Sequence, residues 1–346
     1  MATRPRIKPH FTAVPHSPDV VELRHGGWSA ESYTLSDSSG AGALARLVEL
    51  LDGSRTVAEL AREAGVSRRD VDGLLDHLTD LGALEDGPTT ALDAYVARAA
   101  PALLPFGGGA ATEVSEPVVL GSSALAGRVA DLLAESLAVA GTRVRTEDDG
   151  ALLALAARPG TAADPFALAE AAEAFAGWRD HLVVAPQESV RPHVAVVLNR
   201  LAMHCGFTWL HAVVDGPSLV VGPLTVPHRS ACYECFEARV AMNLRESASY
   251  LRYKTALAQG RAAGAVPEVE PVLGAMLAAH TAAEALNMLL TGTTFTVGKA
   301  LNIYLPTMEL TYNEVLRLPG CPACGPEPYA RDEELFFDVR AVLDGA

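Results

Sequence analysis

Two pairs of cysteines constrain the fold of this chain more than any other feature of its sequence. Cys232 and Cys235 form the motif CYEC, and Cys321 and Cys324 form the motif CPAC further along the chain. Each C-x-x-C turn presents two thiolates to one tetrahedral centre, so two such turns brought together by the fold make a closed site for zinc. The sequence therefore predicts a structural zinc site, with no coordination position left for water or substrate.

Two local disulfides are the alternative reading of these motifs. A disulfide that closes only two intervening residues belongs mostly to redox enzymes, and the start MATRPRIKPHF lacks the apolar stretch of a signal peptide. The chain contains one further cysteine, Cys205. A thiol carrier and a small core side chain both suit this position, and its apolar neighbours Ala202 and Met203 favour the core.

Length, composition and charge favour a two-domain cytoplasmic protein. The chain has 346 residues, of which 49% are hydrophobic, and domains of about 150 residues give an expectation of two. We expect no membrane segment, because no apolar run is expected to reach the length that spans a bilayer. The formal net charge of -15 argues against nucleic acid and anionic membrane surfaces as partners, since both attract basic proteins.

The first 88 residues are predicted to form a winged helix-turn-helix with a ribbon of short strands in front. Residues 6–35 are extended in character and are interrupted by a glycine pair at 26–27, which predicts two or three strands. Leucines at helical spacing in residues 42–51 predict the first helix. A capping box made by Thr56 and Glu59 predicts the start of the second helix.

The third helix of this module is predicted to begin after Ser67 and to end at Gly82. Modules of this kind usually bind DNA, but residues 41–87 hold five arginines against ten acidic residues. Phosphates would be repelled by such a surface. A DNA-binding regulator with a sensor domain therefore stays open only as an alternative.

The segment LVELLDGSRTVAELAREAGVSRRDVDGLLDHLTDLGALED resembles the PqqD-like RiPP recognition element, a domain that binds the leader of ribosomally made precursor peptides. The resemblance implies that the leader adds as a strand to the edge strand at residues 32–35 and packs beside the third helix. The apolar stripe of that helix is also expected to serve the core of the domain. The implied peptide-binding residues are Ser32, Tyr33, Thr34, Leu35, Val71, Leu74, Leu75 and Leu78.

A linker at residues 89–115 separates this module from a large α/β domain at residues 116–346, in which strand and helix patterns alternate. That alternation predicts a doubly wound, largely parallel sheet. The first predicted strands are residues 116–122, 142–148, 151–157, 181–187 and 208–215. The helices predicted between them are residues 123–141, 165–178 and 190–206. After Gly216 the prediction is a strand at 218–226, helices over 236–260 and 269–290, and strands at 300–305 and 309–318.

The segment VGPLTVPHRSACYECFEARV, followed later by CPAC, resembles the ThiF/MoeB family of adenylating enzymes. With a recognition element in front, the chain is most similar to the ThiF-like partner proteins of TOMM cyclodehydratases, which make thiazole- and oxazole-bearing peptides. The resemblance implies a Rossmann-type large domain, a homodimer formed through that domain, and a YcaO-type cyclodehydratase as partner. It also implies the function: binding the precursor leader and presenting the core to that enzyme.

The turn that holds ATP in active ThiF-like enzymes is degenerate in this chain. The family pattern is close to G-x-G-G-x-G; Gly121 and Gly127 are present, but Ser123 and two alanines stand where glycines are expected. A β carbon at such a position pushes a phosphate away. We therefore expect no ATP site and no intrinsic activity, with an active ATP-dependent adenylating enzyme as the alternative.

Three acidic residues after the second predicted strand of the large domain, Glu147, Asp148 and Asp149, stand where a ribose could be bound. An acidic turn exposed to water is the interpretation that we favour for them.

Overall fold

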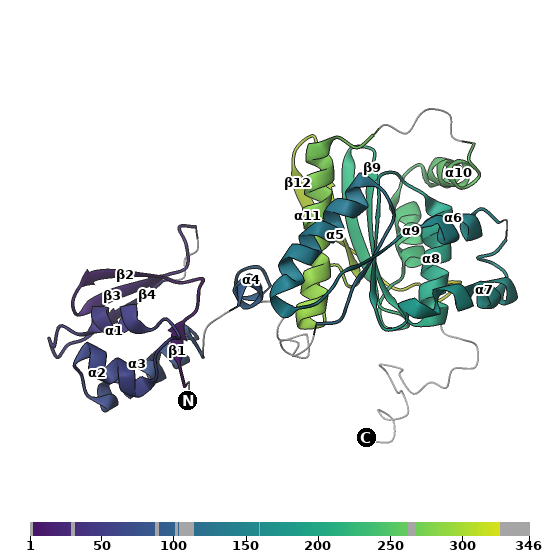
Figure 1. Ribbon diagram of the computed structural model, residues 1–346. Coiled ribbons are helices and arrows are strands. Elements are labelled where there is room, and N and C mark those ends of the chain that lie inside the picture. The colour runs from purple at the N-terminus through teal and green to yellow at the C-terminus, as the bar shows by residue number, and fades with distance from the viewer. Residues whose placement is uncertain are drawn as a thin grey trace, which may run out of the picture. The chain divides into compact units, whose positions relative to one another are not determined.

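The computed structural model describes residues 3–28, 32–86, 90–100, 103, 114–158, 160–261 and 268–325. The chain forms two compact units, which are described separately (Figure 1). The first consists of Met1–Thr112, Glu135–Thr142 and Leu290–Gly292, and the second of Glu113–Ala134, Arg143–Leu289 and Thr293–Ala346.

The strands of the first unit form two small antiparallel sheets. The three-stranded sheet has the order β2-β3-β4, so β4 lies at its edge. The two-stranded sheet joins β1 to β5 and thereby ties the start of the unit to the residues after its third helix. The strands are β1 (Pro5–Ile7), β2 (Thr12–Ser17), β3 (Val20–Arg24), β4 (Ser32–Ser36) and β5 (Leu84–Asp86).

Three helices cover this ribbon: α1 (Leu44–Leu50), α2 (Val57–Ala64) and α3 (Arg68–Asp80). The predicted caps are confirmed, because Thr56 and Glu59 form a reciprocal capping box and Ser67 caps α3 together with Asp70. The core between ribbon and helices contains fully buried leucines, among them Leu23, Leu60 and Leu78. A short helix, α4 (Ala91–Ala99), follows in the stretch predicted as linker. Winged helix-turn-helix, as a class for this unit, stays a prediction.

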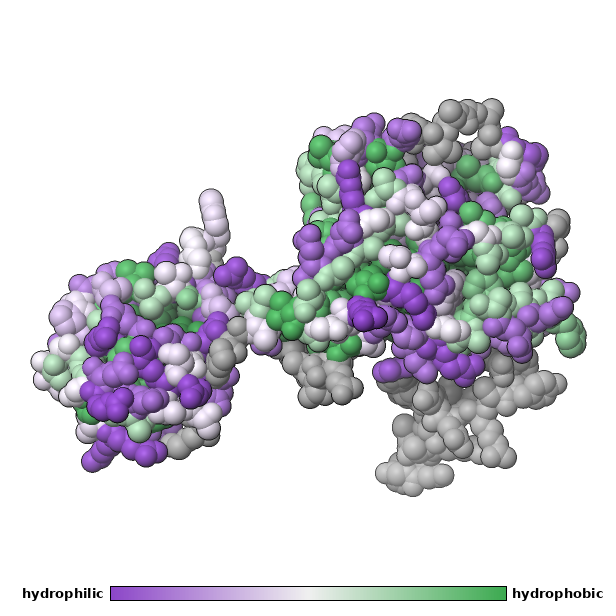
Figure 2. Space-filling model, in the orientation of Figure 1, coloured by the Kyte–Doolittle hydropathy of each residue, from purple (hydrophilic) through white to green (hydrophobic). Residues whose placement is uncertain are grey.

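The surface over α2 and α3 is mostly hydrophilic in the view of Figure 2. On α3, the side chains of Asp76 and Asp80 are exposed. Arg68 and Arg69 are exposed on the same helix, but Arg68 is paired with Asp72, so acidic side chains offset the basic ones here and a phosphate backbone gains little attraction.

A seven-stranded mixed sheet forms the centre of the second unit, in the order β12-β11-β10-β9-β8-β6-β7. The strands from β7 to β9 in this order pair in parallel, as the alternating pattern predicts. The strands from β9 to β12 pair antiparallel, so the sheet is parallel in one half only. The strands are β6 (Val118–Leu120), β7 (Arg145–Glu147), β8 (Leu182–Gln187), β9 (Thr208–Asp215), β10 (Ser218–Thr225), β11 (Lys299–Tyr304) and β12 (Glu309–Glu314).

Helices lie on both faces of this sheet. Figure 1 shows α5 and α11 on one face and α6, α8 and α9 on the other. The helices are α5 (Ala124–Leu137), α6 (Gly150–Ala156), α7 (Pro165–Ala172), α8 (Pro192–Cys205), α9 (Tyr233–Asn243), α10 (Ser247–Ala258) and α11 (Pro271–Thr291), with 3-10 turns at Ala138–Ala140 and Glu173–Trp178. The result is a three-layer α/β unit, which is the architecture expected for a doubly wound domain.

The prediction of a strand at residues 151–157 is wrong, because residues 151–156 belong to α6 and Ala157 caps that helix. The segment is a short apolar run, and such a run does not distinguish a buried strand from a buried helix by periodicity. Its composition of alanine and leucine favours a helix. Leu152 and Leu155, three residues apart, are the buried residues of α6 and both belong to the core cluster.

The helix α11 is long and apolar enough to cross a membrane by length and composition alone, contrary to the expectation that no segment reaches that length. In its apolar window, 56% of the residues are buried inside the protein. The buried carboxylate of Glu284 in this helix accepts hydrogen bonds from Thr294 and Thr296. These features are typical of the core helix of a soluble domain.

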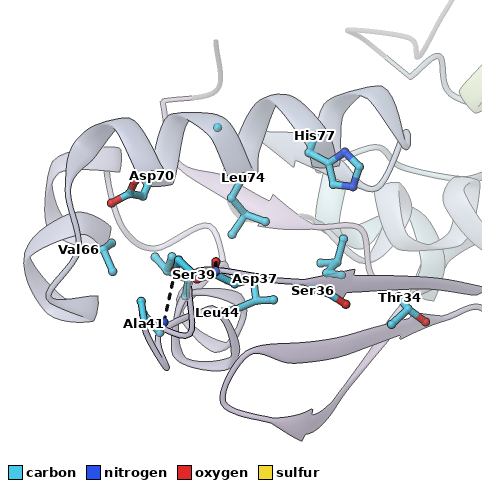
Figure 3. Close-up of a pocket in the computed structure, with 14 residues that line it drawn as sticks. Thr34, Ser36, Asp37, Ser39, Ala41, Leu44, Val66, Asp70, Leu74 and His77 are labelled. Atoms are coloured by element: carbon cyan, nitrogen blue, oxygen red, sulfur yellow. Dashed lines mark hydrogen bonds between the residues drawn. The ribbon is translucent and has the colours of Figure 1, made fainter.

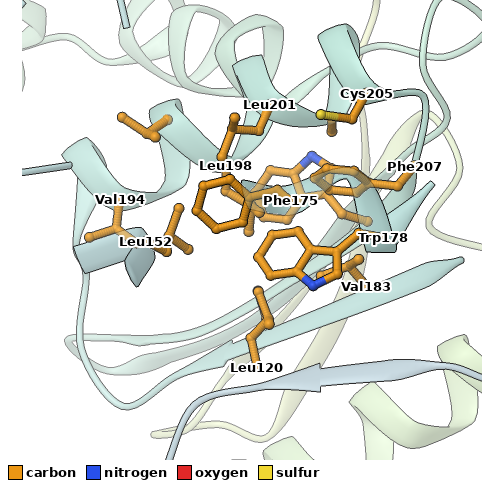
Figure 4. Close-up of a cluster of buried hydrophobic side chains, with 14 of the residues drawn as sticks. Leu120, Leu152, Phe175, Trp178, Val183, Val194, Leu198, Leu201, Cys205 and Phe207 are labelled. Carbon is orange, nitrogen blue, oxygen red and sulfur yellow. The ribbon is translucent and has the colours of Figure 1, made fainter. Parts of the chain in front are cut away.

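A large cluster of buried side chains in the second unit lies between the parallel strands and the helices α6, α7 and α8 (Figure 4). Cys205 is part of this cluster, and its Sγ lies 3.8 Å from the carbonyl oxygen of Ala172. Burial raises the pKa of the Cys205 thiol. A buried thiol of this kind is protonated and unreactive, so Cys205 serves the core.

Candidate functional site

The four cysteines of the CYEC and CPAC motifs meet at one buried point of the second unit. Their sulfur atoms all lie within 4.8 Å of one another. The Sγ–Sγ distances are 3.9 Å for Cys232–Cys235, 3.6 Å for Cys232–Cys321 and 3.4 Å for Cys235–Cys324. A metal bound tetrahedrally at about 2.3 Å from each sulfur separates the sulfurs by about 3.8 Å. The donor set therefore fits one tetrahedral metal ion, and the alternative of local disulfides, which require about 2 Å, is excluded.

The first cysteine pair is held by the start of α9. Cys232 is the N-cap residue of this helix, and Cys235 lies in its first turn. The backbone N–H of Tyr233 donates to the side-chain oxygen of Asn199 in α8 at 3.1 Å. Helix N-termini favour negative charge, so the position of the pair stabilises the thiolate form that binds a metal.

A buried ion pair fixes the same turn of α9 to α8. The guanidinium of Arg200 donates to both carboxylate oxygens of Glu234, at 2.5 and 2.7 Å. Both side chains are mostly buried. The two helices are thereby locked at the point where the first thiolates must be placed. The sequence analysis did not identify this pair, because the partners lie 34 positions apart.

The second cysteine pair lies in a tight turn after β12. The backbone N–H of Leu318 donates to Cys235 Sγ at 3.3 Å, so the second turn also supports a sulfur of the first pair. A β carbon on Gly325 would lie 2.5 Å from the carbonyl oxygen of Cys321, closer than real contacts allow. Glycine is therefore required directly after the motif. Arg317 donates to the carbonyl oxygens of His228 and Cys324 and ties the turn to the loop before α9.

A groove of about 770 Å³ opens on the first unit between α3 and the edge strand β4. Figure 3 shows α3 on one side of it, with Asp70, Leu74 and His77, and β4 with the following loop on the other. Leucines from α1 and Val66 complete an apolar floor. Among the residues that the structure describes, β4 pairs with β3 alone, so its second edge is open beside the groove.

The structure divides the eight predicted peptide-binding residues into three sets. Thr34, Leu35 and Leu74 line the groove, whereas Ser32 and Tyr33 lie on β4 outside the set of lining residues. Val71, Leu75 and Leu78 are buried in the core of the unit and do not line the groove. The helix explains this division, since residues three and four apart share a face. The groove-lining face of α3 is the neighbouring one, made by Asp70, Gly73, Leu74 and His77.

In the turn after β6, backbone N–H groups hydrogen-bond to other groups of the protein. Gly121 has φ of +110°, and its N–H donates to the carbonyl oxygen of Glu147 at 2.8 Å. At the start of α5, the N–H of Ala126 donates to Ser123 Oγ at 3.2 Å, and that of Leu125 faces a carboxylate oxygen of Glu188 at 3.4 Å. Free backbone N–H groups at the start of a helix can bind phosphate. Here a carboxylate and a hydroxyl occupy them.

The acidic residues after β7 are likewise engaged within the protein. The indole of Trp178 donates to Glu147 at 2.8 Å, and the N–H of Gly150 donates to Asp148 at 2.9 Å. Asp149 lies 3.8 Å from Arg191. The sequence favoured an acidic turn exposed to water; Asp148 is exposed, whereas Glu147 and Asp149 are partly buried and contact protein groups.

The fold belongs to a class shared by heterocyclases and MccB, as comparison with solved structures shows. A heterocyclase determined with substrate and cofactor matches with a TM-score of 0.62 and 19% identity, over 93% of this chain and 39% of that one. The heterocyclase TruD matches with a TM-score of 0.63 and 20% identity, over 99% of this chain and 47% of its own. This chain thus spans less than half the length of these heterocyclases.

MccB of E. coli, determined with ATP, matches with a TM-score of 0.56 and 13% identity, over 93% of this chain and 99% of its own. At such identities the likeness establishes a common fold. The sequence matches no protein-family model and no curated protein.

Proposed function

We propose that this chain is the leader-binding component of a peptide-heterocyclising system, and that it delivers a ribosomal precursor peptide to a separate YcaO-type cyclodehydratase. The observation that carries the proposal is the groove beside the open edge of β4. An extended leader can add to that edge through main-chain hydrogen bonds while alternate side chains enter the groove. The apolar side chains of Leu44, Leu47 and Leu74 would receive them.

The fold of the second unit supports a role beside a larger enzyme. Two heterocyclases share the fold, and their chains are more than twice as long as the part that this chain matches. We propose that the separate partner supplies what that extra length contains, including the ATP chemistry. A tethered leader raises the effective concentration of the core at the partner's active site, so the partner need not recognise each residue.

The metal of the four-cysteine centre is, in this proposal, a zinc ion with a purely structural role. Four thiolates leave no open position, and a tetrahedral sulfur site is the usual site for zinc in proteins. We further propose a cytoplasmic homodimer with a leader-binding domain at residues 1–88, a linker at 89–115 and a ThiF-like domain at 116–346. Reduced cysteines agree with a reducing compartment.

The full-length match to MccB, a protein determined with ATP, supports a second candidate: an ATP-dependent adenylating enzyme. The occupied donors at the start of α5 argue against it. ATP–pyrophosphate exchange by the purified chain alone would establish this second function.

Fluorescence polarisation with a labelled leader peptide tests the proposed function. We expect saturable binding that Leu74→Glu abolishes, because the new carboxylate would stand in the apolar part of the groove. Leu310→Glu is the matched control, since Leu310 is exposed on β12 of the other unit and should leave the affinity unchanged. A leader that binds no better than its scrambled sequence would refute the proposal.

A further inference from the structure

A second cavity, of about 330 Å³, lies in the second unit between the antiparallel half of the sheet and the helices α9 and α10. Val213 and Val220 of the sheet and Phe236 of α9 give it apolar walls. At about 30 Å³ for each water-sized group, it holds a ligand of roughly ten non-hydrogen atoms. Its size falls at the lower end of small-ligand pockets.

A buried ion pair stands at one side of this cavity. Glu237 accepts hydrogen bonds from Tyr233 at 2.9 Å, from Tyr250 at 2.9 Å and from Lys254 at 3.0 Å. The carboxylate is therefore well satisfied. Lys254 is only 9% exposed, and among the described residues the ammonium hydrogen-bonds to Glu237 alone. Since an ammonium has three N–H donors, two remain for a ligand.

Hydrogen-bond acceptors without partners face the same space. The Nδ1 atom of His211 donates to the carbonyl oxygen of Gly222 at 3.1 Å, because a carbonyl can only accept. The Nε2 atom of this neutral ring is then an acceptor, and no described residue donates to it. The side chains of Asp215 and Asn302 also line the cavity without a hydrogen bond to any described residue. These groups line the cavity and have no partner among the described residues, so they are available to hydrogen-bond a ligand that enters it.

The charges that line the cavity favour an uncharged ligand. Lys254 is paired with Glu237 and Arg191 with Asp149, so neither cation is left over for a free anion. Burial raises the pKa of the remaining carboxyl, Asp215, and so disfavours its charged form, which weakens the attraction for a free cation. An amide offers what the walls lack: a carbonyl oxygen for the Lys254 ammonium and an N–H for His211 or Asp215. Small side chains on either side of the amide fit the valine and phenylalanine walls.

We propose that this cavity binds one or two uncharged residues of a peptide chain, which it recognises through their backbone amide. The site is independent of the leader groove, because every residue in the argument belongs to the second unit. It gives the second unit a direct contact with peptide, in addition to any leader that the first unit binds.

Saturation-transfer NMR with the full-length chain tests the site, using N-acetylalanine methylamide as the probe and acetate and methylammonium as charged comparators. We expect saturable binding of the amide and binding of the charged probes at least about tenfold weaker. Val220→Phe should fill the cavity and weaken amide binding by at least about tenfold, and Asn302→Leu should weaken it with little change in volume. Val272→Phe is the control, since Val272 is exposed on α11.

Thermal melting of each variant verifies that the fold is retained. Equal amide binding by wild type and by a folded Val220→Phe variant would overturn the proposal, and so would equally tight binding of the charged probes. Leader polarisation with the same variants separates the two hypotheses. Amide binding that persists when the leader does not bind rejects the proposed function and leaves this site standing.

Discussion

Replacing Gly73 by alanine tests the peptide groove, because the substitution should move stability and peptide affinity in opposite directions. Gly73 lies in the interior of α3, is exposed and lines the groove. A β carbon built on it would meet no atom within 4 Å, so the folded chain has room for a side chain there. An exposed helical glycine costs about 1 kcal/mol relative to alanine. We infer that the open space is kept for the backbone of the bound leader.

The variant should stabilise the first unit by about 0.5–1 kcal/mol, which raises its melting temperature by roughly 2–8 °C for a domain of this size. Leader affinity should fall, because the added methyl group would overlap a peptide that passes close to α3. Overpacking of a well-fitted contact costs about 1–3 kcal/mol, equivalent to a five- to 150-fold weaker complex. Calorimetry of the full chain measures the first effect and fluorescence polarisation with labelled leader the second.

Gly127→Ala is the matched control for this test. Gly127 is also an exposed helical glycine with open space around its Cα, but it lies in α5 of the second unit. It should gain similar stability and leave leader affinity unchanged. If Gly73→Ala stabilises the chain and binds leader as wild type does, no peptide approaches this face of α3 and the reasoning about the groove fails.

Three further predictions concern the second unit. Cys321→Ser should lower the metal content measured by plasma mass spectrometry and destabilise this unit without changing leader affinity. Glu234→Gln removes the charged partner of the mostly buried Arg200 and should cost about 3 kcal/mol in denaturant unfolding; no loss would show that the pair is dispensable. Burial lowers the pKa of His211 from 6.5 to about 4. The unfolded chain therefore takes up the proton first, and stability should fall by up to about 3 kcal/mol between pH 6.5 and 4, a slope that His211→Phe should remove.

Local signals in the sequence predicted most of the fold. The caps at Thr56 and Ser67 and the alternation of strands and helices in the second unit depend on neighbouring residues, and the structure contains them where they were expected. The antiparallel half of the sheet was not predicted as such. Strand direction depends on which strands become neighbours, and β10 and β11 pair although their partner residues, from Val221 and Leu301 onward, lie far apart in the chain. The wrong prediction of a strand at α6 has a local cause, because this apolar run is too short to show whether its period is that of a helix or of a strand.

The candidate sites differ in how far the sequence could predict them. The meeting of the four cysteines followed from the spacing of the two C-x-x-C motifs, which the fold brings to one point. The groove did not. Predicting the groove requires knowing which face of α3 packs into the core. The sequence prediction included Val71, Leu75 and Leu78 among the peptide-binding residues, and the structure buries these three side chains in the core. Gly73 and His77, one helical face away, carry no sequence signal without that knowledge.

The four cysteines also join two elements that line the second cavity, the helix α9 and the end of the sheet at β12. Cys232 and Cys235 hold the first turn of α9, and the next turn of the same helix supplies Phe236 and Glu237 to the second cavity. Cys321 and Cys324 follow β12, whose Asn313 lines the same cavity. A metal bound by all four sulfurs would therefore fix the helix that covers the cavity against the end of the sheet beneath it. In our proposal, a fully coordinated structural ion thus maintains a binding surface without touching any ligand.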